Sequence, residues 1–305
     1  MYPLSCLRLR SLKQLGGLLV PVLLVLLCLP VLGQELALPA KPDSLHFAVI
    51  GDSGTGQSAQ YQVGELLAAY NTKFRYDLVL MLGDNIYGSK NPQDYRAKFE
   101  LPYKKLLDAG VKFYAALGNH DPRDQVSYKL FNMGGERYHT LKAPKEDVRF
   151  FVLDSNYMDQ VQLGWLDKEL ASSKSKWKIC YFHHPLYSSG GRHGSDIELR
   201  KVLEPLFVKH GVSLVLSGHD HFYERVKPQK GIYYFVCGAA GQLAPGDIKR
   251  SDLTIKGFDR DNHFMLMEID GDNLYFQTIS RAGKTVDSGM LLRPAIKPEV
   301  TGAGK

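Results

Sequence analysis

The chain has 305 residues, of which 44% are hydrophobic and 23% are charged, and its formal net charge is +6. These values are ordinary for a globular protein, and the length allows one large domain or two small ones. Three of the positive charges lie in residues 1–33, which contain no acidic residue, so the rest of the chain carries about +3. Such a mild charge argues against nucleic acid or an anionic membrane as the partner, and it favours the approach of an anionic substrate.

The first 33 residues have the pattern of a secretory signal peptide. Arg8, Arg10 and Lys13 give a positive start, and the run Leu18–Leu32 is almost wholly apolar. This run is shorter than the roughly 20 residues that a membrane-spanning helix needs, so a membrane anchor is the alternative rather than the expected interpretation. We expect cleavage before Gln34, secretion of the remainder and no stable membrane anchor, with residues 34–41 forming a short linker.

Apolar runs rich in Val, Ile, Leu, Phe and Tyr alternate with helical stretches along the rest of the chain. Continuous apolar runs are typical of strands that are buried on both faces. The predicted strands are Leu45–Ile50, Tyr76–Leu82, Val111–Leu117, Val148–Leu153, Trp177–Phe182, Val212–Leu216 and Ile232–Cys237. The predicted helices are Ala59–Tyr70, Asp94–Leu107, Leu163–Leu170 and Ser195–His210. Ser195 followed by Glu198 resembles a capping box at the start of the last helix.

The C-terminal part of the chain changes character. Phe264–Ile269 and Leu274–Ser280 flank a turn sequence and therefore predict a β-hairpin. Together the elements predict one α/β domain over residues 42–292, in which two stacked mixed sheets are flanked by helices. Residues 293–305 are expected to form a loose C-terminal tail.

Two cysteines remain once the predicted signal peptide is removed. Cys180 and Cys237 both lie in apolar runs that predict strands. They could pair in an oxidising compartment, or they could remain as buried free thiols. Two cysteines are too few to build a disulfide-based scaffold.

Five short polar motifs follow apolar runs at the points where predicted strands end. They are Gly51-Asp52-Ser53-Gly54, Gly83-Asp84-Asn85-Ile86-Tyr87, Gly118-Asn119-His120-Asp121, His183-His184-Pro185 and Gly218-His219-Asp220-His221. In α/β folds the ligand site lies beyond the carboxyl ends of the strands, so these motifs are expected to converge. A glycine in most of them lets the chain turn sharply and approach an ion closely.

The first two motifs each place a carboxylate at a strand end. Asp52 follows one predicted strand and Asp84 follows the next. As a strand-end residue, Asp52 could also be a simple turn residue or helix cap. Two aspartates at matching positions resemble the shared ligands of a two-ion centre, in which one carboxylate bridges ions about 3.5–4 Å apart.

The third motif supplies Asn119 and His120. Asn is a weak neutral ligand, so its use implies a divalent ion with open coordination positions. His120 is better suited to donate a proton or to contact phosphate, because neighbouring residues in an extended segment point to opposite sides.

The last two motifs supply histidines. One of His183 and His184 could be a structural histidine. His219 and His221 form the stronger pair, because their period-two spacing places both imidazoles on one side of an extended segment. Five such motifs in this order favour a metal centre.

The ordered set resembles the dinuclear metallophosphoesterases, and within them the purple acid phosphatases. The resemblance covers about Leu45 to Gly241, and the residue that carries it is Tyr87, three residues after Asp84. Most metallophosphoesterases begin with Asp-x-His, whereas position 54 here is Gly. The short chain is most similar to the small animal-type, tartrate-resistant enzymes.

The resemblance implies two unlike metal sites. A ferric ion would be held by Asp52, Tyr87 and His221, and a divalent iron, zinc or manganese ion by Asn119, His183 and His219, with Asp84 bridging the two. His183 is preferred to His184 because the family's ligand lies two residues before the proline. Phenolate and carboxylate oxygens suit a ferric ion, and imidazoles suit a divalent one.

The resemblance also implies a secreted acid phosphatase that hydrolyses phosphomonoesters by attack of a metal-bound hydroxide. His120 resembles the family's substrate-binding and acid histidine. His193 resembles a second histidine outside the metal ligands, although a plain surface histidine is the alternative. The expected substrates are small phosphate esters or phosphoproteins.

Other functions are compatible with parts of the sequence. Phe47–Thr55 resembles the opening block of the GDSL esterases, in which Ser53 would be the nucleophile. This interpretation leaves the other four motifs unexplained and finds no well-placed late Asp-x-x-His. A non-catalytic metal- or phosphate-binding protein of the same fold is a second alternative, and redox chemistry at the same centre is a possible side activity.

Overall fold

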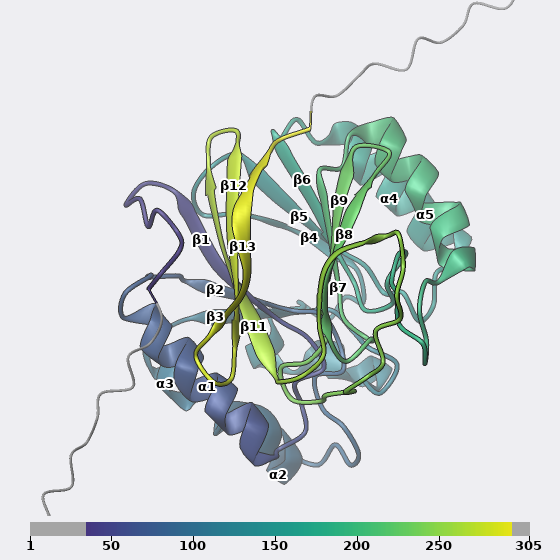
Figure 1. The fold of residues 1–305 in the computed structure, drawn as a ribbon. Coiled ribbons are helices and arrows are strands. Elements are labelled where there is room, and N and C mark those ends of the chain that lie inside the picture. Colours follow the sequence, from purple (N-terminus) through teal and green to yellow (C-terminus); the bar gives the residue numbers. More distant parts are fainter. Residues whose placement is uncertain (1–34, 295–305) are drawn as a thin grey trace, which may run out of the picture. The chain divides into compact units, whose positions relative to one another are not determined.

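The computed structural model describes residues 35–294, so the predicted signal peptide and most of the predicted C-terminal tail lie outside the described residues. Within the described part, two β-sheets pack face to face and helices cover their outer faces (Figure 1). This confirms the predicted α/β fold of two stacked mixed sheets flanked by helices. No helix in residues 35–294 is long and apolar enough to cross a membrane.

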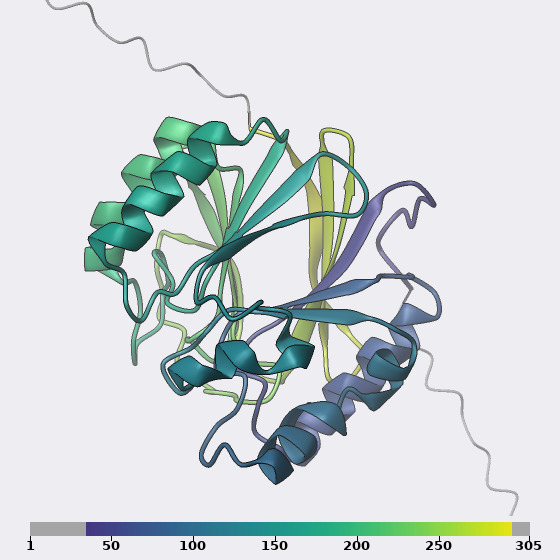
Figure 2. The same cartoon turned by 180° about the vertical axis from the view of Figure 1, so that it is seen from behind.

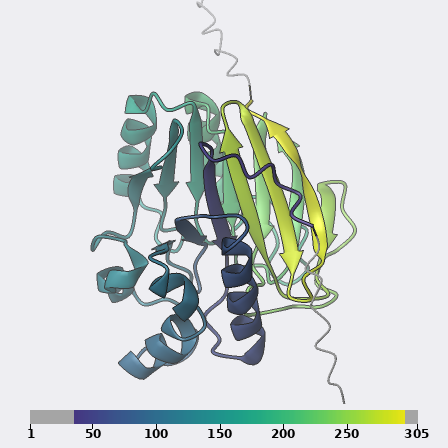
Figure 3. The same cartoon turned by 90° about the vertical axis from the view of Figure 1, so that its left-hand side faces the viewer.

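The first sheet has six strands in the order β13-β12-β11-β1-β2-β3. Their bounds are β1 Leu45–Ile50, β2 Leu78–Met81, β3 Lys112–Ala115, β11 His263–Asp270, β12 Asn273–Ser280 and β13 Thr285–Leu292. The strands β1, β2 and β3 are parallel, whereas β11, β12 and β13 form antiparallel hairpins beside β1 (Figure 3). The predicted hairpin is therefore confirmed as β11 and β12.

The second sheet has seven strands in the order β10-β8-β9-β7-β6-β5-β4. Their bounds are β4 His139–Lys142, β5 Val148–Val152, β6 Trp177–Tyr181, β7 Leu214–Ser217, β8 Tyr223–Gln229, β9 Ile232–Cys237 and β10 Thr254–Phe258. The strands β5, β6, β7 and β9 are parallel neighbours. The strands β4, β8 and β10 lack the apolar runs that marked the others, and the sequence did not predict them.

Two groups of helices lie on opposite sides of the paired sheets (Figure 2). One group comprises α1 Ser58–Asn71, α2 Pro92–Tyr95 and α3 Lys104–Asp108, and the other comprises α4 Gln160–Ser172 and α5 Ile197–His210. Two short 3₁₀ helices, Arg123–Ser127 and Lys129–Phe131, follow β3.

The strand β1 shows why the predicted strands read as continuous apolar runs. Phe47 and Val49 belong to the core between the two sheets, while Ala48 and Ile50 belong to the core beneath the helices. Successive side chains of a strand point to opposite faces, so a strand covered on both faces needs an apolar residue at every position. Cys180 and Cys237 are both buried and both free, which resolves the alternatives left by the sequence.

Two details of the helix prediction were wrong. The predicted helix Asp94–Leu107 is divided into α2, a π-helical turn at Arg96–Glu100 and α3, and Pro102, which has no N–H to donate, lies at the second break. The N-cap of α5 is Asp196, which accepts a hydrogen bond of 2.9 Å from Leu199 N. Ser195 instead exchanges hydrogen bonds with the backbone of Ser188.

Residues 35–41, the described part of the predicted linker 34–41, run against the first sheet. Ala37 N donates to Gln277 Oε1 at 2.9 Å, while Ala40 N and Lys41 N donate to the two carboxylate oxygens of Glu268 at 2.7 and 2.9 Å. The acceptors lie on β12 and β11, so buried polar groups of the sheet hold this segment in place.

Glu268 should make the stability of the protein depend on pH. Burial alone would raise its pKa, but the nearby His46 ring and hydrogen bonds from Lys41, Ser44 and Ala40 outweigh burial and lower the pKa from 4.5 to about 2. A depressed folded-state pKa gives stability that is complete above the unfolded value of 4.5 and is lost as the pH falls toward 2. The shift corresponds to about 3 kcal/mol.

We therefore expect Glu268→Gln to lower the free energy of unfolding by about 3 kcal/mol at neutral pH, and by progressively less below a pH of about 4.5. Urea denaturation of both proteins at a series of pH values measures this difference. Glu136→Gln, at an exposed position, is the matched control and should change little. A Glu268→Gln difference that stays constant with pH would contradict the prediction.

Candidate metal centre

The five polar motifs meet where the carboxyl ends of strands from both sheets come together. Three motifs follow β1, β2 and β3 of the first sheet, and two follow β6 and β7 of the second. His183 Nδ1 lies 2.9 Å from Leu82 O, and Ala240 N donates to Gly51 O at 3.0 Å, so the two sheets are bonded to each other at this edge. The predicted convergence is therefore present.

One group of donors consists of Asp52, Tyr87 and His221. The Tyr87 hydroxyl donates to Asp52 Oδ1 at 3.1 Å and lies 3.3 Å from His221 Nε2. His221 Nε2 also lies 3.4 Å from Asp52 Oδ1. Two oxygen donors and one nitrogen donor thus face one another, and their spacing allows all three to contact one ion.

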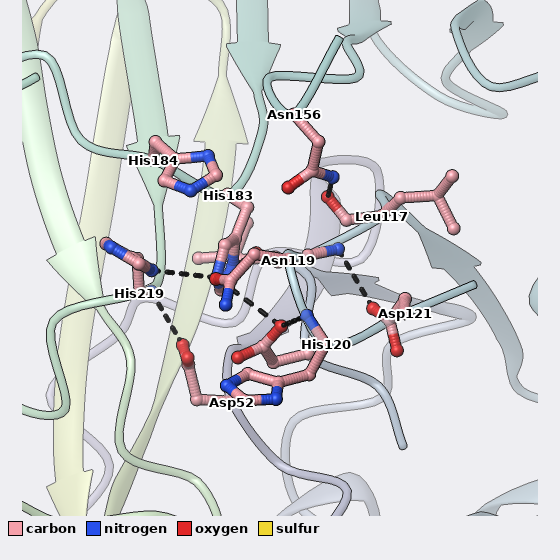
Figure 4. A network of polar contacts seen from close by, with 12 residues as sticks. Asp52, Leu117, Asn119, His120, Asp121, Asn156, His183, His184 and His219 are labelled. Atoms are coloured by element: carbon pink, nitrogen blue, oxygen red, sulfur yellow. Dashed lines mark hydrogen bonds and ion pairs between the residues drawn. The ribbon is translucent and has the colours of Figure 1, made fainter. Parts of the chain in front are cut away.

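A second group consists of Asn119, His183 and His219, which point toward one another from three different loops (Figure 4). His183 Nε2 lies 2.9 Å from Asn119 Oδ1 and 3.1 Å from His219 Nδ1. This group has two imidazoles and one amide oxygen, so its donors are neutral and softer than those of the first group.

Asp84 lies between the two groups. Its Oδ1 is 3.5 Å from His183 Nε2 in the second group. Its carboxylate also offers an oxygen within 4.8 Å of donor atoms of Asp52 and His221 in the first. Asp84 Oδ1 further accepts a hydrogen bond of 2.9 Å from His120 N. This buried carboxylate therefore lies within reach of donor atoms from both groups.

Three of these residues have left-handed backbone conformations that non-glycine residues rarely adopt. The φ angles are +53° at Asp52, +52° at Asp84 and +69° at His219. Such strain persists where the surrounding structure imposes it, and it concentrates at functional sites. For His219 it corrects the sequence prediction: the segment is bent rather than extended, so His219 and His221 point into different donor groups.

Neighbouring glycines leave room for the carboxylates. A Cβ atom at Gly218 would lie 2.5 Å from Asp52 Oδ2, and one at Gly118 would lie 2.9 Å from Asp84 Cγ. Both distances are shorter than side chains tolerate, so any other residue would push the carboxylates out of place. The glycines that the sequence suggested as turn residues thus serve the packing of the donors.

The electrostatics of the site fit bound cations. Burial raises the pKa of Asp52 to about 7, with the charge of Asp84 adding to the rise and His221 opposing it. Burial lowers the pKa of His219 to about 2 and holds the pKa of His183 well below its ordinary value, so both imidazoles are neutral, as metal ligands must be. Burial, then Asp52 and Asp84, raise the pKa of the Tyr87 phenol. Buried carboxylates are costly unless paired, and a cation here would offset that cost.

The two histidines predicted for catalysis are exposed beside the donor groups. The ring of His120 lies 4.8 Å from the ring of Tyr87, and the ring of His193 lies 4.2 Å from the ring of His219. Each is therefore at the solvent side of one group, where it could contact a substrate.

Residues 45–223 match the family described as calcineurin-like phosphoesterase, which is more than half of the chain. The chain belongs to the calcineurin-like phosphoesterases. It is 30% identical over 251 residues to purple acid phosphatase 17 of Arabidopsis thaliana, covering 70% of this chain and 74% of that protein. It is 26% identical to human tartrate-resistant acid phosphatase type 5, covering 86% and 96%. These relatives confirm the predicted resemblance.

Solved structures share the fold of this phosphoesterase. A purple acid phosphatase from yellow lupin seeds gives a TM-score of 0.66 at 18% identity, covering 84% of this chain and 55% of that one. A dimetal phosphatase from Danio rerio gives 0.65 at 15% identity, covering 82% and 99%. The GAP50 anchor of the Plasmodium inner membrane complex gives 0.72 at 18% identity, covering 84% and 90%. At these identities the likeness concerns the fold alone.

Sequence reasoning gave Asp121 no role, although this residue ties two loops of the phosphoesterase together. Its carboxylate accepts hydrogen bonds from the backbone N–H groups of Asn85, Ile86 and Gly118 and from the side chains of Asn85 and Gln125. These bonds join the Asp84 loop to the Asn119 loop. In the sequence, only its position next to Asn119 and His120 hinted at a role for Asp121, because the residues of the Asp84 loop that it bonds lie about 35 residues away.

His184 also lies closer to the centre than the sequence indicated. His183, His184 and His219 each offer a nitrogen within 4.8 Å of the others. However, His184 Nδ1 is 2.8 Å from Ser155 Oγ, which occupies that nitrogen. Asn156, which no sequence signal identified, lies near the same edge (Figure 4).

The structure also bears on the alternative site at Ser53. Ser53 is only 2% exposed, so a substrate cannot reach its hydroxyl unless the surrounding loops rearrange. A serine nucleophile must be accessible to the ester it attacks. The buried position of Ser53 argues against the esterase interpretation.

Proposed function

We propose that this phosphoesterase is an acid phosphatase that hydrolyses phosphomonoesters at a dinuclear centre holding a ferric ion and a divalent iron, zinc or manganese ion. The observation that carries the proposal is the convergence of two unlike donor groups on one buried carboxylate, Asp84. The curated relatives named above are acid phosphatases, and this supports the same activity here.

The donor chemistry supports the proposed metals. The phenol of Tyr87 and the carboxylate of Asp52 are hard oxygen donors, which favour a highly charged ion such as Fe(III). Asn119, His183 and His219 provide a neutral set that suits a divalent ion. When bound, such ions would lower the pKa of coordinated water and neutralise charge on the phosphate.

The protein's own residues would bind the substrate and move protons. We assign His120 as the group that protonates the leaving oxygen, because it is exposed next to the centre while its backbone is fixed to Asp84. We assign His193 to binding the phosphate on the opposite side. Arg192, the residue before His193, lies close to His221. Burial lowers the pKa of His221, but Asp52 and Asp84 raise it above its usual value, and the charge of Arg192 opposes this rise. All three groups would favour an anionic substrate.

We further propose that the substrates are small phosphate esters or phosphoproteins and that the protein is secreted. The positive start and short apolar run of residues 1–33 support secretion. The residue types of all seven proposed ligands are present, and this favours an active phosphatase over a non-catalytic binding protein.

The purified protein should contain two metal ions per chain, absorb visible light through a Tyr87–Fe(III) charge-transfer band and hydrolyse p-nitrophenyl phosphate at acidic pH. Tyr87→Phe removes the phenolate and should abolish the visible band while the protein stays folded. Metal analysis, an optical spectrum and the phosphatase assay test these points together.

Tyr157→Phe is the matched control, because the Tyr157 residue is 48% exposed and lies outside both donor groups. It should keep the band. A wild-type protein that is active with zinc alone and shows no visible band would refute the ferric assignment. A metal-loaded protein without phosphatase activity would refute the proposed function.

A further inference from the structure

A basic groove lies next to the proposed active site. Its cavity has a volume of about 620 Å³ and is lined by residues of β10 and of the loops on either side of this strand. Four of the lining residues are cations, namely Lys249, Arg250, Lys256 and Arg260, and all four are exposed. A volume of this size is typical of sites for small molecules.

The charge of this groove is not neutralised from within the protein. Across residues 35–294 none of the four cations forms an ion pair. The acids in or next to the segments that line the groove are Asp247, Asp252 and Asp259, and Asp259 Oδ2 already accepts a hydrogen bond of 2.8 Å from Gly246 N. Unpaired cations gathered in one cavity attract an anionic ligand.

The groove is joined directly to the loop that carries His193. Gly191 N donates to Asp247 O at 2.9 Å, and Lys249 N donates to Ser189 O at 2.8 Å. A Cβ atom at Gly191 would lie 3.0 Å from Lys249 Nζ, so the Lys249 ammonium lies against the backbone of this loop. Arg192 and His193 follow immediately, and the His193 ring packs on His219.

The other end of the groove flanks the strand that follows His221. Phe258 pairs with Tyr223, two residues after His221, and Ala244 N donates to His221 O at 3.0 Å. Both the His193 loop and the His221 segment therefore connect the metal centre to the groove. A leaving group that extends from the centre over this side would meet the cations.

We propose that the groove binds a second phosphate on the leaving group, so that the preferred substrates are bisphosphorylated small molecules such as sugar bisphosphates. This inference rests on the proposed phosphatase function. The scissile phosphate would lie at the donor groups, while Lys249 and its neighbours hold the second phosphate. Charge-assisted contacts to phosphate provide the selectivity.

The test compares fructose 1,6-bisphosphate with fructose 6-phosphate on the metal-loaded enzyme. The quantity measured is the ratio of the two kcat/KM values. We expect the ratio to be on the order of tenfold or more in the wild type at low salt. In Lys249→Met/Lys256→Met this ratio should fall to about twofold, which is the advantage of having two phosphates that can be cleaved. The two lysines together would account for the rest of the preference, since each exposed contact contributes modestly. Raising the ionic strength from about 0.05 M to about 0.3 M should also lower the wild-type ratio.

Lys112→Met/Lys168→Met is the matched control. It removes the same charge from two exposed lysines that form no ion pair in the described residues, and Lys112 lies at the start of β3, the end remote from the site. Its ratio should equal that of the wild type. Calorimetric titration of the metal-free protein with each sugar reads the groove without turnover, with the bisphosphate expected to bind the wild type more tightly.

The outcomes separate this inference from the proposed function. An enzyme that hydrolyses p-nitrophenyl phosphate but shows no preference for the bisphosphate, or keeps its preference in the groove variant, would overturn the groove assignment alone. A protein without phosphatase activity that still binds the bisphosphate through Lys249 and Lys256 would refute the function and support the groove. A wild-type enzyme with a higher kcat/KM for acidic phosphopeptides than for fructose 6-phosphate, but no higher kcat/KM for the bisphosphate, would also overturn the inference.

Discussion

Asp84→Asn should deprive the protein of both metal ions and reduce phosphatase activity more than any other single substitution at the site. The carboxylate lies 3.5 Å from His183 Nε2 and within 4.8 Å of the donor atoms of Asp52 and His221, so it contributes to both groups. Asparagine keeps the volume but removes the charge that two cations would share. Loss of a residue that only orients a metal ligand lowers metal affinity or activity roughly 10- to 100-fold, and loss of a ligand shared by two ions should lower them more.

Metal content per chain and kcat/KM for p-nitrophenyl phosphate measure this effect. Asp77→Asn is the matched control, because Asp77 is exposed just before the same strand, β2, at the end away from the site. It should retain both ions and full activity. Two ions per chain in Asp84→Asn would contradict a bridging role, and loss of one ion alone would assign Asp84 to a single site.

Asp121→Asn should lower the free energy of unfolding by about 3 kcal/mol, a large effect for one polar substitution. The Asp121 carboxylate accepts hydrogen bonds from five N–H donors, which surround both of its oxygens. Asparagine replaces one acceptor oxygen with an NH₂ group, which would face N–H donors that then lack an acceptor. A buried group left unsatisfied in this way is destabilising.

The same substitution should weaken metal binding, because these bonds hold the Asp84 and Asn119 loops together. Chemical denaturation measures the stability, and titration of the metal-free protein measures the affinity for the divalent ion. Asp124→Asn, three residues away on an exposed 3₁₀ turn, is the control for a charge lost from the same region. Unchanged stability in Asp121→Asn would show that the network adds nothing to the loops.

Much of the fold and the site could be predicted because their signals are local. A strand covered on both faces must be apolar at every position, so β1, β6 and β9 could be located from the sequence. Polar residues placed directly after such strands must meet at one edge of a sheet. The seven proposed ligands follow this pattern, and the structure brings all seven together.

Other features depend on contacts between distant segments and had no local signal. Strands β4, β8 and β10 carry polar residues and form through pairing with their neighbours rather than through their own pattern. At the bend, the His219 N–H donates to Asp52 Oδ2 at 2.8 Å, and Asp52 lies in the loop after β1 of the other sheet. A period-two spacing could not reveal it.

The sequence by itself determined the family, the apolar strands that are covered on both faces and the residue types that can hold metal, because each of these is encoded in short, contiguous stretches. Only the tertiary structure decided that the backbone bends at His219, that Asp121 ties two loops together and that a basic groove opens beside His193. These depend on side chains from segments far apart in the chain, and their positions are set by packing of the two sheets against each other.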